Sequence, residues 1–213
     1  MPTATTTLIA AAVIGYFLGS IPFGYLLVRF FLKHDVRGTG SGNIGATNVA
    51  RTSPKLGVLT LLLDAFKGFA AVWIASQLGD ADPTSAVSLL PMSVAALGAV
   101  VGHSFPIWLR FRGGKSVATA LGSFVLIAPL AVLALVALFV SIVVLTRYVS
   151  LGSTLGALLF PILAWRLDHR GWPELALLAA ASLLVFIRHH ANIRRLLGGN
   201  ESRFGFGVKG QTR

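Results

Sequence analysis

Apolar segments long enough to cross a lipid bilayer recur along this chain, and they constrain its fold more than any other feature. A transmembrane helix needs about 20 consecutive, mostly apolar residues, and residues 8–32, 56–78 and 89–109 each meet that requirement. Charged residues make up 12% of the chain and the mean hydropathy is +0.79, whereas soluble domains contain roughly 25% charged residues. The sequence therefore predicts an all-α polytopic membrane protein, with a single domain over residues 1–213.

The second half of the chain adds further apolar segments. The stretch over residues 116–145 is too long for one straight span, and Pro129 divides it because proline interrupts the hydrogen bonding of a helix. We expect seven transmembrane segments in all, of which the fourth and the sixth are short, and a kink in the first at residues 19–22. The four later segments are expected near residues 116–127, 130–146, 151–165 and 173–187.

Basic residues lie almost entirely in loops on one side of the predicted membrane. The loops after segments one, three, five and seven hold fourteen of them, and Lys and Arg concentrate in cytoplasmic loops. We therefore expect an N-terminus outside and a cytoplasmic C-terminus. The fourteen are Lys33, Arg37, Arg51, Lys55, Arg110, Arg112, Lys115, Arg147, Arg188, Arg194, Arg195, Arg203, Lys209 and Arg213. The opposite loops hold Arg166 and Arg170 beside Asp80, Asp82, Asp168 and Glu174.

Composition excludes several kinds of site. The chain has no cysteine, so disulfides, thiolate metal sites and a cysteine nucleophile are ruled out. The first seven residues contain no basic residue, so we expect no cleaved signal peptide. A net charge of +11 could indicate a nucleic-acid partner, but the basic residues stand at the ends of loops and are better explained by membrane topology.

The first of three polar clusters follows the first apolar segment. Its glycines, Gly40, Gly42 and Gly45, allow backbone conformations in which successive N–H groups converge on an anion. Arg51 adds a guanidinium suited to phosphate. The alternative is a plain polar turn, but such a turn needs fewer amides and hydroxyls. The other polar residues of the cluster are Ser41, Asn43, Thr47 and Asn48.

The second cluster follows the third segment. A glycine pair, Gly113 and Gly114, leads through Lys115 and Ser116 into a predicted helix, which is a suitable place to bind phosphate. The spacing does not match a Walker A loop, so ATP hydrolysis is not implied. The alternative is that the basic residues of this cluster only set the membrane topology and that Ser116 caps the helix. His103 lies near the end of the third segment, where an ionisable side chain indicates a functional role.

The third cluster follows the last segment. His189, Asn192 and Arg195 are spaced three residues apart and so share one face of a helix. A lone histidine there would be a cap, but one that shares its face with Asn and Arg is more typical of a site. Asp64 and Lys67 in the second segment form an i,i+3 pair whose simplest role is to neutralise both charges inside the bundle.

Together the clusters resemble the bacterial acyl-phosphate:glycerol-3-phosphate acyltransferase family. The resemblance rests on residues 41–48 with Arg51, on residues 102–106 with 113–119, and on residues 189–195. It implies an enzyme of the bacterial inner membrane that transfers a fatty acyl group from acyl phosphate to the 1-hydroxyl of glycerol 3-phosphate. The products would be lysophosphatidic acid and phosphate. It also implies a seven-helix fold, a cytoplasmic active site, no metal or cofactor and no obligate protein partner.

The resemblance and the clusters together define the expected site. Arg112 stands where the family is expected to have Lys, which keeps the charge but changes the hydrogen-bonding geometry. As catalytic residues we expect Ser41, Asn43, Lys115, His189 and Asn192. As substrate- or phosphate-binding residues we expect Gly40, Gly42, Gly45, Thr47, Asn48, Arg51, His103, Gly113, Gly114, Ser116 and Arg195.

An acyl phosphate is already activated, so the enzyme needs no nucleophile of its own. Holding two substrates in the right orientation can then supply much of the acceleration. The proton of the attacking hydroxyl can go to His189 or to the phosphate that leaves the donor. We favour the phosphate, with His189 binding the acceptor.

Three other classes of membrane-associated protein fit the sequence less well. A transporter for a small anion can also use broken helices, but it should place its polar groups near the membrane midplane. A retinal photoreceptor would need a lysine in its last helix, and residues 173–187 contain none. A peripheral acyltransferase with an HxxxxD motif is not supported, because none of the five histidines has Asp at the required spacing.

Overall fold

The computed structural model describes residues 3–78 and 86–205, and the regular secondary structure over those ranges is entirely helical. Asp80, Asp82, Lys209 and Arg213, which contribute to the charge asymmetry of the loops, lie outside the described residues. In chain order the α-helices are α1 (Ala4–Ser20), α2 (Phe23–Leu32), α3 (Ala46–Thr52), α4 (Pro54–Ser76), α5 (Ala86–Ser104), α6 (Val117–Phe124), α7 (Pro129–Thr146), α8 (Val149–Asp168), α9 (Trp172–Ile187) and α10 (His190–Leu197). The two 3₁₀ helices are η1 (Val36–Gly38) and η2 (Ile107–Leu109).

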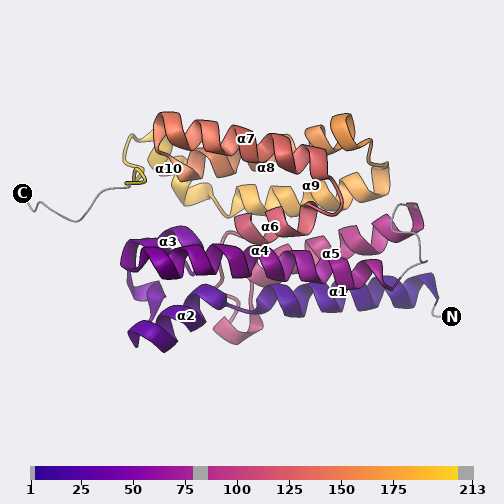
Figure 1. Ribbon diagram of the computed structural model, residues 1–213, viewed down its shortest axis with the longest axis horizontal. Helices are drawn as coiled ribbons and strands as arrows, with labels where there is room; N and C mark the ends of the chain where they lie inside the picture. The colour runs from indigo at the N-terminus through magenta and orange to yellow at the C-terminus, as the bar shows by residue number, and fades with distance from the viewer. Residues whose placement is uncertain (1–2, 79–85, 206–213) are drawn as a thin grey trace, which may run out of the picture.

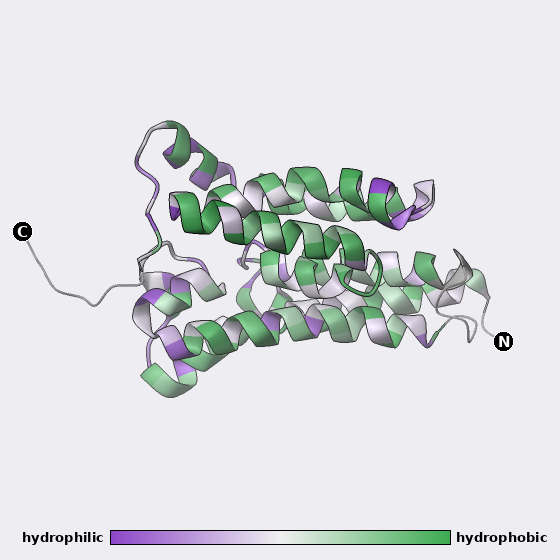
Figure 2. Ribbon diagram, turned by 45° about the horizontal axis from the view of Figure 1, so that its top comes forward, coloured by the Kyte–Doolittle hydropathy of each residue, from purple (hydrophilic) through white to green (hydrophobic). Residues whose placement is uncertain are grey.

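The long helices form two groups that lie side by side (Figure 1). One group contains α1, α4 and α5, and the other contains α7, α8 and α9, with α5 packed against α9. The short helix α6 lies between them, where Phe124 stacks on Phe160 of α8 with ring centroids 4.1 Å apart. Figure 2 shows apolar residues along the helices and polar residues gathered towards their ends.

Helices α1 and α5 pack closely because small residues face each other. A Cβ atom on Gly15 would lie 2.3 Å from the carbonyl oxygen of Ala95, and one on Gly19 would lie 2.2 Å from that of Ala99. Contacts of this kind let two membrane helices bring their backbones together, which replaces the hydrophobic driving force that is absent in lipid.

Within residues 3–78 and 86–205, five helical segments are long and apolar enough to cross a membrane, or up to six if α9 and α10 form one bent span. The first of the five comprises α1 and α2 together. The predicted kink is confirmed as a break between α1 and α2 at residues 21–22, and α6 is short as expected. The prediction that the sixth segment is short is wrong, because α8 has 20 residues. Polar residues after residue 165 continue the helix, and the Asp168 carboxylate at its end accepts hydrogen bonds from the N–H groups of Leu130 (3.1 Å) and Ala131 (2.8 Å) in α7.

The buried pair in α4 does more than neutralise charge. Lys67 Nζ lies 2.8 Å from the Asp64 carboxylate, as the spacing predicted. The same ammonium donates a 2.7 Å hydrogen bond to the carbonyl of Ile21, at the break between α1 and α2. A broken helix leaves carbonyls without partners, and in a bilayer these must be satisfied within the protein. Lys67 therefore stabilises the break that directs α2 away from α1.

Candidate active site

The first polar cluster forms a loop whose shape is fixed by one buried side chain. Gly40 and Gly42 adopt positive φ, +55° and +70°, as expected, whereas Gly45 has φ −78° and stands at the N-cap of α3. Asn48 accepts from the N–H of Ser41 (2.8 Å), and its amide nitrogen donates to three loop carbonyls. These belong to Val36, Thr39 and Asn43, at 3.2, 3.1 and 2.8 Å. The contacts thus make Asn48 the residue that holds this loop together.

Of the remaining polar side chains of this loop, one shapes the backbone and three are available to a ligand. Asn43 Oδ1 accepts a hydrogen bond from the N–H of Gly45 (2.7 Å) and so turns the chain into α3. Ser41, Thr47 and Arg51 are exposed, and their side chains have no hydrogen-bond partner among the described residues. Arg51 lies against Gly40, where a Cβ atom would come within 3.3 Å of its Cδ.

The second cluster folds back on the end of α5. The N–H groups of Gly113 and Gly114 donate to the carbonyls of Ser104 (3.2 Å) and His103 (3.0 Å). A Cβ atom on Gly114 would lie 2.1 Å from His103 Nε2, so only glycine fits there without a shift. His103 is buried beneath this loop, with Nδ1 3.2 Å from the Thr119 hydroxyl and 3.6 Å from the Asp64 carboxylate.

Ser116 is also buried and supports the loop. Its Oγ lies 2.7 Å from Ser104 Oγ and 2.9 Å from the carbonyl of Val100. It precedes α6 with φ +62° and makes no capping hydrogen bond, so the alternative interpretation of Ser116 as a cap is wrong. Its contacts tie the start of α6 to α5 and leave it 1% exposed.

Arg188 joins the second and third clusters and was not among the expected site residues. Its Nε and Nη2 donate to the carbonyls of Gly114 and Gly113, both at 3.0 Å. Its guanidinium carbon lies 5.3 Å from the centre of the Phe105 ring. The sequence signal was its position directly before His189. Arg188 therefore fixes the end of α9 against the glycine loop.

The third cluster occupies the bend of 54° between α9 and α10. His189 is buried, and its Nδ1 lies 2.8 Å from the carbonyl of Val185. A carbonyl only accepts, so Nδ1 carries the proton and Nε2 is left as an acceptor. Asn192 accepts a hydrogen bond from Lys115 Nζ, which brings the second and third clusters into direct contact.

Glu201, after α10, is the central residue that the sequence interpretation missed. Its carboxylate accepts hydrogen bonds from Asn192 Nδ2 (2.6 Å), Arg195 Nε (2.6 Å) and Ser150 Oγ (2.9 Å). Burial raises the pKa of Glu201, but these hydrogen bonds outweigh it and hold the pKa below its usual value. Glu201 is therefore ionised, and it orients Asn192 towards Lys115.

Lys115 lies where the three clusters converge. Burial lowers the pKa of its ammonium to about 8, and Arg195, Arg51 and Arg188 contribute in the same direction, while Glu201 opposes them. A cation that is partly desolvated among other cations is a suitable site for an anion. A neighbouring cavity of about 470 Å³ is lined by residues of all three regions: Asp35, Arg37, Gly42, Phe111, Arg112, Gly113 and Arg188.

A family model described as glycerol-3-phosphate acyltransferase matches residues 9–199. The chain belongs to this acyltransferase family. Among curated relatives named glycerol-3-phosphate acyltransferase, that of Allorhizobium ampelinum is 47% identical over 94% of this chain and 93% of its own length. That of Syntrophotalea carbinolica is 48% identical over 89% of this chain and 93% of its own.

Solved structures of the glycerol-3-phosphate acyltransferase family share the fold. Crystal structures of PlsY (YgiH), an integral membrane glycerol 3-phosphate acyltransferase, are 35% identical to this chain. The glycerol 3-phosphate form has a TM-score of 0.84, with 93% of this chain and 96% of that chain covered. The lysophosphatidic acid form has a TM-score of 0.80, with 93% and 95% covered.

Proposed function

We propose that this chain transfers a fatty acyl group from an acyl phosphate to the 1-hydroxyl of glycerol 3-phosphate, giving lysophosphatidic acid and phosphate. Family membership supports acyl transfer to glycerol 3-phosphate. The observation that carries the proposal is the convergence of Lys115, Asn192 and Glu201 with three arginines beside an anion-binding loop. The family also sets aside the transporter alternative, because its members are named as acyltransferases.

The acceptor is assigned to the site around Lys115. Lys115 and Arg51 bind the phosphate of glycerol 3-phosphate, and Glu201 positions Lys115 through Asn192. The unprotonated Nε2 of His189 accepts a hydrogen bond from a glycerol hydroxyl, an arrangement that the contact of Nδ1 with Val185 supports. Each of these contacts orients the acceptor and none requires a covalent intermediate.

The donor phosphate is assigned to the first loop, where Ser41, Thr47 and the backbone around Gly42 are free to bind it. The 1-hydroxyl oxygen forms a bond to the acyl carbon, and the bond from that carbon to the phosphate oxygen breaks. The hydroxyl proton passes to the departing phosphate, while His189 binds the acceptor. The backbone N–H groups of the first loop, with the Ser41 and Thr47 hydroxyls, stabilise the charge that develops on the leaving group.

The topology is part of the proposal. We count seven segments by including α6 as a short crossing, in a single integral-membrane domain. Helix α1 begins at one end of the bundle and α10 lies at the other, an arrangement that an odd number of crossings would produce (Figure 1). The distribution of basic residues favours an N-terminus outside and a site on the cytoplasmic face of the bacterial inner membrane. The enzyme acts with membrane lipid around it and without metal, cofactor, nucleic acid or an obligate protein partner.

The choice of donor is tested with purified protein and glycerol 3-phosphate. Acyl phosphate, acyl-CoA and acyl carrier protein are offered in separate reactions, each with and without a chelator. We expect product from acyl phosphate alone, at a rate that the chelator does not change. Comparable rates with acyl-CoA, or loss of activity in the chelator, would contradict the proposal.

A further inference from the structure

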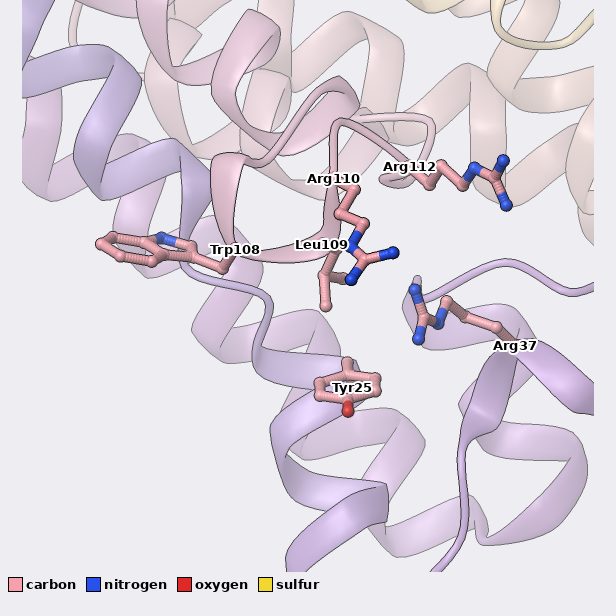
Figure 3. Close-up of a pocket in the computed structure, with 6 residues that line it drawn as sticks. All are labelled: Tyr25, Arg37, Trp108, Leu109, Arg110 and Arg112. Carbon is pink, nitrogen blue, oxygen red and sulfur yellow. The ribbon is translucent and has the colours of Figure 1, made fainter.

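A second basic cavity adjoins the one at the candidate site (Figure 3). It has a volume of about 500 Å³ and is lined by Tyr25, Arg37, Trp108, Leu109, Arg110 and Arg112. It shares Arg37 and Arg112 with the first cavity but contains none of the residues assigned to the acceptor. The mechanism proposed above does not use it.

The wall formed by η2 is held in a fixed shape. Leu109 is buried in one apolar cluster with Val28 and Ile44, which anchors η2 to the α2–α3 region. After it, Arg110 and Phe111 both have positive φ, +52° and +61°, a conformation that costs non-glycine residues roughly 1 kcal/mol or more each. The N–H of Phe111 donates to the carbonyl of Pro106 (3.0 Å) and closes the turn. Arg110 is therefore positioned by the backbone and projects from a rigid turn.

The cavity carries uncompensated positive charge. Arg37 is paired with Asp35 at 2.7 Å, and its guanidinium lies 5.1 Å from the centre of the Tyr25 ring. In the described part of the chain, Arg110 and Arg112 have neither an ion pair nor a side-chain hydrogen bond. Figure 3 shows the guanidinium ends of Arg110 and Arg37 pointing towards each other. Guanidinium groups in this arrangement are typical of a phosphate site.

Exposed aromatic side chains flank these arginines along the chain. Trp108, which lines the cavity, is 60% exposed, and Phe111, which follows Arg110, is 57% exposed. Tryptophan concentrates where a membrane protein meets the boundary between hydrocarbon and headgroups. A ligand that fits both features has an anionic head for the arginines and acyl chains for the exposed aromatic side chains of Trp108 and Phe111.

We propose that this cavity binds the phosphate of an anionic phospholipid from the surrounding membrane, separately from the substrates of acyl transfer. The lipid phosphate lies between Arg110 and Arg37, and its chains pass over Trp108. The bound lipid rests on the turn that continues into Gly113 and Gly114, so it stabilises the loop that presents Lys115. The geometry of the cavity favours this lipid whatever acyl donor the enzyme uses.

Native mass spectrometry of the full-length protein tests the proposal by titration with phosphatidylglycerol or phosphatidylcholine in detergent. We expect one phosphatidylglycerol to be retained, with at least tenfold preference over phosphatidylcholine, and Arg110→Gln to weaken retention by about tenfold. Arg166→Gln is the matched control, because Arg166 also lies beside an exposed tryptophan, 4.5 Å from the ring centre of Trp165, without lining this cavity. We expect the control to bind like wild type.

Two further measurements distinguish lipid binding from loss of fold and from binding of a free anion. Arg110→Lys keeps the charge and should recover part of the binding, and a thermal unfolding curve for each variant identifies loss of fold. Inorganic phosphate in millimolar excess should leave the lipid bound. Equal retention by wild type and Arg110→Gln would overturn the proposal, as would equal losses in Arg110→Gln and Arg166→Gln. Full displacement by inorganic phosphate would also overturn it, because the cavity would then be a site for free anions.

Discussion

The lowered pKa of Lys115 predicts that acceptor binding depends on pH in a range where the substrate itself does not titrate. With a pKa of about 8, about 90% of Lys115 is charged at pH 7 and about 10% at pH 9. A phosphate monoester loses its second proton near pH 6, so it is already a dianion throughout this interval. If the ammonium binds the phosphate, kcat/KM for glycerol 3-phosphate should fall about tenfold from pH 7 to pH 9.

The linkage between proton binding and substrate binding sets the direction of the change in kcat/KM and the pH range in which it occurs. The charged form of Lys115 is present below its pKa and is lost as pH rises, so the decline lies on the alkaline side. Bound phosphate raises the pKa, and kcat measured at saturating acceptor should therefore decline less than kcat/KM. Stability changes in the opposite direction. Because the unfolded chain binds this proton more tightly, the free energy of unfolding should rise between about pH 8 and pH 10.5.

The assay measures initial rates against glycerol 3-phosphate concentration in wild type and in Lys115→Arg, at several pH values from 7 to 9. Arginine remains charged throughout, so the variant should show a flat profile whatever its absolute rate. A wild-type kcat/KM that is constant over the interval would refute the role of Lys115 as the phosphate-binding cation. A decline of the same size in Lys115→Arg would assign the titration to another group.

Three substitutions test the remaining roles. Arg51→Ala should lower kcat/KM by roughly 10- to 150-fold, since a charge-assisted hydrogen bond is worth about 1.5–3 kcal/mol, while the protein still inserts and purifies. His189→Asn should chiefly raise the KM for glycerol 3-phosphate, with part of the rate recovered at high concentration. Gly114→Ala should abolish most activity because its Cβ would meet His103 Nε2, whereas Gly38→Ala, with nothing within 4 Å, should behave like wild type.

Each of these three expectations would be contradicted by a specific experimental result. Wild-type kinetics in Arg51→Ala would limit that arginine to membrane topology. A His189→Asn enzyme with unchanged KM and no measurable kcat would make the histidine the general base. Equal activity of the Gly114 and Gly38 variants would mean that the glycine loop tolerates a shift away from α5.

The sequence predicted features that depend on local chemistry. Glycine spacing indicated the positive φ values at Gly40 and Gly42, and the proline at residue 22 indicated the break in the first span. The sequence could not distinguish a polar group that binds a ligand from one that stabilises the shape of a loop. Asn48 and Ser116 carry the same donors and acceptors in either role, and only the fold shows that theirs point inward.

Glu201 and the length of α8 were missed for a related reason. Both involve charged residues at the edge of an apolar pattern, where hydropathy alone indicates a loop. Glu201 becomes buried by pairing with Asn192 and Arg195. Asp168 ends its helix by capping another one. In each case the partner lies on a different segment, and sequence spacing does not encode such a pairing.

The contact between Asn192, Glu201 and Lys115 has a consequence for the timing of biosynthesis. A polypeptide enters the membrane from its N-terminus onward, so the helices that carry the first two polar loops are inserted while α9 and α10 are still being made. Asn192 is oriented towards Lys115 only after residue 201 has been synthesised and α10 has folded. A nascent chain, or one truncated before residue 201, therefore carries the cations of the site without their alignment.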